Sequence, residues 1–226
     1  MSGRNLKKKI HQILVQDDFA EGLAAIRRYP ARQAINPLFS FLFSSDEFVK
    51  WRAVIAMGDV VAGLAEEDLE SARNVMRRLM WNLNDESGGI GWGSAEAMGE
   101  IMARHARLAE EYACILISYI RPAGNFIEHE LLQRGVLWGL GRLAWARPRL
   151  ISDAAEFLPA YMASPDPALR GLAAWAAGAI GDPRTKPRLK RLLGDTATVR
   201  IFIGNRPVEF SIDRLAQDAL ANPNSS

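Results

Sequence analysis

The stretch LRGLAAWAAGAIGDP at residues 169–183 decides the fold of this 226-residue chain. Its first, fourth, fifth, eighth, ninth and twelfth residues are apolar or small, a spacing that places them on one face of an α-helix. Gly181, Asp182 and Pro183 then end the helix. Because half of the face is alanine, a neighbouring helix can approach closely. The stretch therefore predicts a helix that packs against others of its kind.

Three upstream segments repeat this pattern in weaker form: VKWRAVIAMG (49–58), IGWGSAEAMG (90–99) and LQRGVLWGLG (132–141). Each ends in a glycine that aligns with Gly178, and the four glycines follow one another at intervals of 37 to 42 residues. This period is typical of repeats built from two helices each. The sequence therefore predicts a stack of helix pairs.

The segment 169–183 resembles the HEAT-like repeat of the phycobilisome-lyase type, whose pattern is V-R-x-A-A-x-A-L-G-x-I-G-D-P. The resemblance covers roughly residues 30–195. It implies an all-α fold, a right-handed α-α superhelix (HEAT-like solenoid) of about five helix pairs. It implies no single function, because such repeats serve mostly as binding surfaces and only sometimes as enzymes.

We expect a single domain over residues 1–226, with two capping helices within residues 1–28 and the repeats within residues 30–195. Residues 198–221 are different: apolar residues alternate on both sides of Gly204-Asn205, which predicts a small C-terminal β-hairpin before a final helix. The predicted helix pairs of the repeats are 33–43 with 47–64, 69–83 with 94–105, 108–120 with 130–146, and 150–162 with 167–180.

A second stripe runs along the second helix of each pair, at the third and seventh aligned positions. These positions are four residues apart and therefore share a face. In the family pattern they are usually polar, whereas here they hold four of the six tryptophans. The second helices of a HEAT solenoid line its inner curve, so we expect a concave stripe of Trp51, Trp92, Glu96, Arg134, Trp138 and Trp175.

The stripe has two interpretations. Tryptophan and arginine are enriched at binding hot spots, which favours a non-catalytic scaffold or adaptor that binds a protein or peptide partner on its concave face. Alternatively, the rings are buried packing residues between repeats.

An enzyme is the competing hypothesis. Trp92, Glu96, Arg134 and Trp175 resemble in order and spacing the cleft residues of HEAT-like alkylpurine DNA glycosylases, with Glu96 in place of that family's aspartate. A chromophore lyase is the other enzymatic alternative, although no specific residue indicates it.

No catalytic residue, metal ligand set or cofactor is expected, because no familiar catalytic or metal-binding motif occurs. The histidines are scattered and are expected at the surface or at helix ends, and Cys114 is expected to be buried and inert. The loop Gly88–Gly93 has four glycines in six residues. It is interpreted either as a functional loop or as a turn that fits against a neighbouring repeat.

Net charge is only +2, so no strongly basic field is available to hold nucleic acid, which is the weaker partner hypothesis. The charge is unevenly distributed: residues 59–130 are acidic, whereas the residues before and after them are basic, including a run from Arg184 to Arg191. The chain shows no secretory signal pattern and no apolar run of spanning length, so we expect a cytoplasmic protein without a membrane partner.

Overall fold

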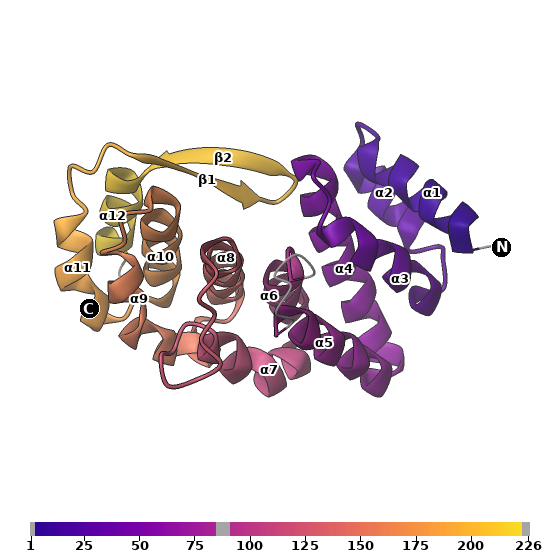
Figure 1. Cartoon of the computed structure of the whole chain (residues 1–226), viewed down its shortest axis with the longest axis horizontal. Helices are drawn as coiled ribbons and strands as arrows, with labels where there is room; N and C mark the ends of the chain where they lie inside the picture. Colours follow the sequence, from indigo (N-terminus) through magenta and orange to yellow (C-terminus); the bar gives the residue numbers. More distant parts are fainter. Residues whose placement is uncertain (1–2, 85–90, 223–226) are drawn as a thin grey trace.

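The computed structural model describes residues 3–84 and 91–222, which form an α-solenoid with a small two-stranded sheet (Figure 1). The helices of its N-terminal half are α1 (Gly3–Val15), α2 (Phe19–Ile26), α3 (Ala31–Leu42), α4 (Glu47–Glu67), α5 (Leu69–Leu83), α6 (Ser94–Arg104) and α7 (Ala106–Ser118). The C-terminal half contains α8 (Glu130–Ala146), η1 (Pro148–Glu156), α9 (Leu158–Tyr161), α10 (Pro167–Ile180), η2 (Pro183–Thr185), α11 (Lys186–Arg191), β1 (Thr198–Ile203), β2 (Arg206–Ser211) and α12 (Ile212–Ala221).

The second helices of the repeats form the inner row, as predicted. In Figure 1, α4, α6, α8 and α10 follow one another along the arc, and each packs against the next. The helices α5 and α7 and the segment η1 pack behind this row, and α12 extends it beyond α10. One hydrophobic core runs through all of them, from Leu6 in α1 to Ala219 in α12.

Aspartates begin several of these helices. The side chains of Asp18, Asp46, Asp68 and Asp166 each accept a hydrogen bond from a backbone N–H of the first turn of the helix that follows, at 2.9 to 3.1 Å. Such caps satisfy donors that have no partner inside the helix. Local sequence therefore sets the helix starts, which explains why they could be predicted.

The expected helix over residues 150–162 is wrong. The segment is instead the 3₁₀ stretch η1 followed by the single turn α9. Pro148 and Pro159 stand at the starts of these two pieces, and a proline inside a continuous helix would remove a hydrogen bond and clash with the preceding turn. Ile151 also has a non-helical backbone, with φ of −128°.

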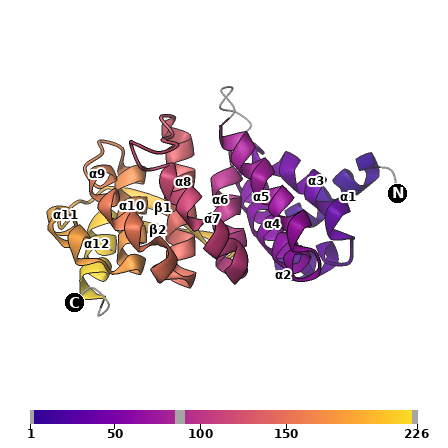
Figure 2. The ribbon, with the colours of Figure 1, turned by 90° about the horizontal axis from the view of Figure 1, so that it is seen from below.

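The predicted hairpin is present. Strands β1 and β2 are antiparallel, with Ile203 opposite Arg206 across the Gly204-Asn205 turn. Gly204 has a φ of +62°, a conformation that favours glycine. Figures 1 and 2 show the hairpin lying along the inner side of the arc, from the end that holds α10 and α12 to the start of α4.

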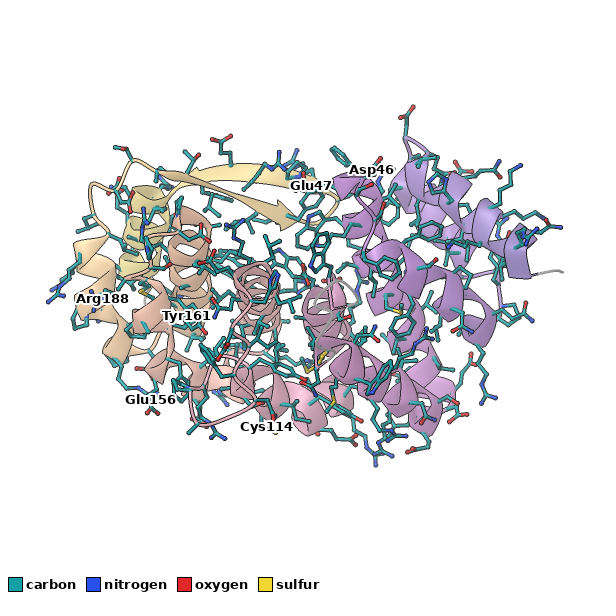
Figure 3. The ribbon with its side chains drawn as sticks, in the orientation of Figure 1. Asp46, Glu47, Cys114, Glu156, Tyr161 and Arg188 are labelled. Atoms are coloured by element: carbon teal, nitrogen blue, oxygen red, sulfur yellow. The ribbon has the colours of Figure 1, made fainter. Side chains whose placement is uncertain are left out.

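Two further expectations concern the exposure of Cys114 and the possibility of a membrane-spanning helix. Cys114 is exposed on α7, not buried, because it points away from the core face of that helix (Figure 3). None of the described helices combines the length and apolar character that a bilayer crossing requires.

Helices α6 and α8 cross at two glycines. A Cβ atom added to Gly99 would lie 2.4 Å from the Cα atom and 2.5 Å from the carbonyl oxygen of Gly139. Both contacts are with backbone, which cannot move aside as a side chain can. The small-residue face that the sequence predicted therefore sets the spacing of the inner row.

We predict that Gly99→Ala lowers the free energy of unfolding by about 3 kcal/mol, at the upper end of the range for overpacked cores. The control is Gly63→Ala in α4, where an added Cβ atom meets nothing within 4 Å. Because alanine favours helix, this change should stabilise the protein by roughly 0.5–1 kcal/mol. Urea denaturation measures both, and an unchanged midpoint for Gly99→Ala would contradict the close crossing.

Candidate functional site

The hairpin is held on the inner helices by an aromatic cluster. The ring of Phe202 in β1 stacks on Trp51 of α4, with ring centroids 4.8 Å apart and an interplanar angle of 14°. Trp51 also contacts Trp138 of α8, at 4.6 Å between centroids. The indole N–H of Trp138 donates a hydrogen bond to the carbonyl oxygen of Phe202 at 3.1 Å. Three elements that are distant in sequence therefore meet at this cluster.

Polar contacts hold the hairpin near the start of α4. Arg200 forms an ion pair with Glu47, the first residue of α4, which lies beside the hairpin in Figure 3. At the turn, Arg52 Nε donates to Asn205 Oδ1 at 3.2 Å. The same guanidinium donates to the carbonyl oxygens of Leu14 and Gln16, so it links the hairpin to the loop between α1 and α2.

The hairpin borders two pockets on the inner face. The first, which we name the Trp92 pocket, has a volume of about 640 Å³ and is lined by residues that include Lys50, Trp51, Trp92, Glu96, Arg134 and Asp166. The second, the Trp145 pocket, has a volume of about 660 Å³ and is lined by residues that include Phe19, Glu100, Arg142, Trp145, Trp175 and Phe202. Trp51 and Trp138 line both pockets.

Charges in the Trp92 pocket are paired with one another. Lys50 Nζ lies 2.7 Å from Glu96 Oε1, and Arg134 Nε lies 2.8 Å from Asp166 Oδ2. Glu96 is buried, and its carboxylate packs against the Cα atom of Gly135, where a Cβ would lie 2.6 Å from Oε2. With the Arg200–Glu47 pair at its edge, the pocket holds no uncompensated cation among its described lining residues.

Two glycines place Trp92 at the rim. Gly93 has a φ of +74°, and an added Cβ would lie 2.5 Å from the carbonyl oxygen of Leu42. Gly91 is also close to a neighbouring repeat, because an added Cβ would lie 3.1 Å from the side chain of Leu132 in α8. These two glycines fit against neighbouring repeats as the turn interpretation expects, whereas residues 88–90 of the loop lie outside the described residues. Trp92 itself is 40% exposed.

The six stripe residues do not form one open row. Trp92, Glu96 and Arg134 lie in the Trp92 pocket, Trp51 and Trp138 lie between the pockets, and Trp175 lies in the Trp145 pocket. Trp138 and Trp175 are only 5% and 8% exposed, which agrees with the alternative interpretation that these rings pack between repeats. The hairpin covers Trp138, and Trp175 packs on Gly141.

This separation also divides the four residues that resemble a glycosylase cleft, because Trp175 lies apart from Trp92, Glu96 and Arg134. The Glu96 carboxylate is already engaged by Lys50. His105 caps the start of α7, because its Nδ1 atom accepts a hydrogen bond from the backbone N–H of Leu108. In the part of the chain that the structure describes, no three His, Cys, Asp or Glu side chains cluster as a metal site would require.

Sequence reasoning missed Phe202, Lys50 and Asp166. In a strand, successive side chains point to opposite faces, so the alternating pattern that places Val199 and Ile201 on the buried face predicts that Phe202 lies on the other face. Phe202 is nevertheless buried as well. Asp166 could have been found, because an aspartate directly before Pro167 is a signal for the start of a helix. Nothing in the sequence indicates a role for Lys50 in the pocket, apart from its position next to Trp51.

Comparison with known proteins agrees with this architecture. The family model for HEAT repeats matches residues 127–201. An engineered protein solved by the Northeast Structural Genomics Consortium gives a TM-score of 0.57 at 19% identity, covering 96% of both chains. A designed armadillo repeat protein in complex with the peptide (KR)4 gives 0.55 at 18% identity, over 98% of this chain and 99% of that one. The chain has a HEAT-like repeat fold.

A sequence relative extends the comparison to natural proteins. An uncharacterised protein of Archaeoglobus fulgidus is 30% identical over 109 residues, which are 48% of this HEAT-like chain and 53% of the relative. The match therefore spans about half the length of that protein.

We predict that Phe202→Ala loosens the hairpin. It removes the stack on Trp51 and leaves a cavity, which costs about 3–5 kcal/mol for a buried phenylalanine. Hydrogen exchange of residues 198–211 should accelerate, because the hairpin then opens more readily. The matched control is Ile203→Ala, since Ile203 is the next residue in β1 and is 42% exposed. Equal protection in both variants would contradict the role of the stack.

Proposed function

We propose that this HEAT-like protein is a non-catalytic scaffold that binds a peptide segment of a protein partner in the Trp92 pocket of its concave face. The observation that carries the proposal is an exposed aromatic wall inside a groove whose charges are paired. Trp92 is 40% exposed, and Trp51 is half-buried on the neighbouring helix α4. Exposed tryptophans in a concave site are the residues that most often anchor a protein partner.

The pocket offers both apolar and polar contacts to a peptide. Leu131 and Leu172 add aliphatic surface to the tryptophans, and Leu131 is 47% exposed. The ion pairs Lys50–Glu96 and Arg134–Asp166 keep their remaining donor and acceptor atoms beside the groove. A peptide backbone needs both donors and acceptors, whereas a purely cationic pocket would serve only anions.

The same pairing counts against nucleic acid as the main ligand. Phosphate binding depends on arginine and lysine charges that are free to release counterions. Here Lys50 and Arg134 already face carboxylates at 2.7 to 2.8 Å, and Arg200 is paired with Glu47. The designed armadillo relative was solved with a peptide, which supports the proposal only as an analogy of fold. The phycobilisome-lyase type of the repeat stays a prediction from residues 169–183.

We predict that Trp92→Ala weakens peptide binding roughly 30-fold, because truncating a hot-spot tryptophan costs about 2 kcal/mol. A display library of random 12-residue peptides, screened against the full chain, supplies ligands. Their dissociation constants are then measured by fluorescence anisotropy in both proteins.

Trp81→Ala is the matched control, because Trp81 is 66% exposed on α5 and lines neither pocket. It should leave peptide affinity unchanged. The proposal fails if no peptide is selected, if Trp92→Ala binds the selected peptides as well as the wild type, or if a DNA duplex binds more tightly than every peptide at 150 mM salt.

A further inference from the structure

The Trp145 pocket has largely aromatic walls. Trp145 of α8 stands at its rim and is 58% exposed, whereas Trp175 and Phe202 are at most 8% exposed. Phe19 and Leu23 of α2 add apolar surface. The volume of about 660 Å³ lies within the range of small-molecule sites, roughly 300–1,000 Å³. Such walls suit a flat apolar molecule.

A buried carboxylate holds two arginines in this pocket. Glu100 of α6 is 3% exposed and accepts hydrogen bonds from Nε of Arg104 and Nε of Arg142, both at 2.6 Å. A guanidinium has five N–H donors, so its terminal nitrogens remain after Nε is used. Among the described residues, no acceptor bonds the terminal nitrogens of Arg142, whose side chain is 31% exposed.

The pocket has a surplus of positive charge. An alternating chain of ion pairs runs from Arg27 through Asp59, Arg104 and Glu100 to Arg142. Arginines stand at both ends, so the chain carries one more cation than anions, and its Arg142 end lies in the Trp145 pocket. The Trp92 pocket differs, because its charges are matched one to one.

We propose that the Trp145 pocket is a second binding site, which takes a small amphipathic anion with a flat apolar body and one negatively charged group. The body lies against Trp145 and Trp175, and the charged group accepts hydrogen bonds from Arg142. Charge complementarity selects a single negative charge, because the charged residues among the pocket lining are two arginines, Arg104 and Arg142, and one carboxylate, Glu100. This second proposal does not rest on the proposed peptide binding in the Trp92 pocket.

The probe 8-anilinonaphthalene-1-sulfonate tests the proposal, because it combines flat aromatic rings with one sulfonate. Titration of the full chain, followed by energy transfer from tryptophan to the probe, should show saturable binding of one molecule per chain. Arg142→Gln should weaken binding about tenfold, the size of one lost charge-assisted hydrogen bond. Arg149→Gln removes the same charge from an exposed residue outside both pockets and should leave affinity unchanged.

A second variant acts without touching the ion pairs. Ala20 is exposed on α2 and lines the Trp145 pocket, so Ala20→Trp should fill the pocket while the fold is kept. It should weaken probe binding at least tenfold, and circular dichroism confirms that each variant is folded. If Arg142→Gln fails to fold, Ala20→Trp decides the test.

Three results would overturn the proposal. The first is the absence of saturable binding to the wild-type chain. The second is wild-type affinity in the folded Ala20→Trp variant. The third is a loss of affinity in Trp92→Ala with none in Arg142→Gln, which would place the probe in the other pocket.

Discussion

The contact of Phe202 with Trp51 and Trp138 determines what the inner face of this solenoid presents. A buried indole N–H needs an acceptor, and the carbonyl oxygen of Phe202 supplies it at 3.1 Å. That carbonyl is available because Phe202 and Pro207 form a non-hydrogen-bonded pair of the antiparallel ladder, next to the pair that flanks the turn, so the carbonyl oxygen of Phe202 points away from β2. The stack on Trp51 adds the area of two large rings. With this contact in place, the hairpin becomes part of the wall of both pockets.

Much of the fold follows from local signals in the sequence. Aspartate caps such as Asp46 mark helix starts, glycines such as Gly99 mark close crossings, and Gly204-Asn205 marks the hairpin turn. The position of the hairpin on the helices could not be predicted, because it depends on a contact between residues far apart in sequence. For the same reason, the sequence predicted tryptophans on the inner face without showing that Trp138 and Trp175 are covered.

Part of the Trp145 pocket could nevertheless have been predicted from the helical spacing of the sequence. The stripe was defined by the third and seventh aligned positions, and one further step of four residues leads to Glu100 in α6 and Arg142 in α8. These residues face each other across the two helices at 2.6 Å. The same step from Ile55 leads to Asp59, which binds Arg27 and Arg104. The acidic middle of the sequence therefore supplies carboxylates to α4 and α6, and the basic flanks supply several of their partners.

The hairpin also limits the size of any ligand on the concave face. The strands cross the inner row of helices between α10 and α4 (Figure 1). A ligand of the Trp92 pocket meets Thr198 and Arg200 of β1 at its edge, and a ligand of the Trp145 pocket meets Phe202 and Phe210. A peptide long enough to pass both would have to displace the Phe202 stack. Both proposed ligands are therefore a short segment or a small molecule that fits within one pocket, and Trp51 and Trp138 form the wall that the two pockets share.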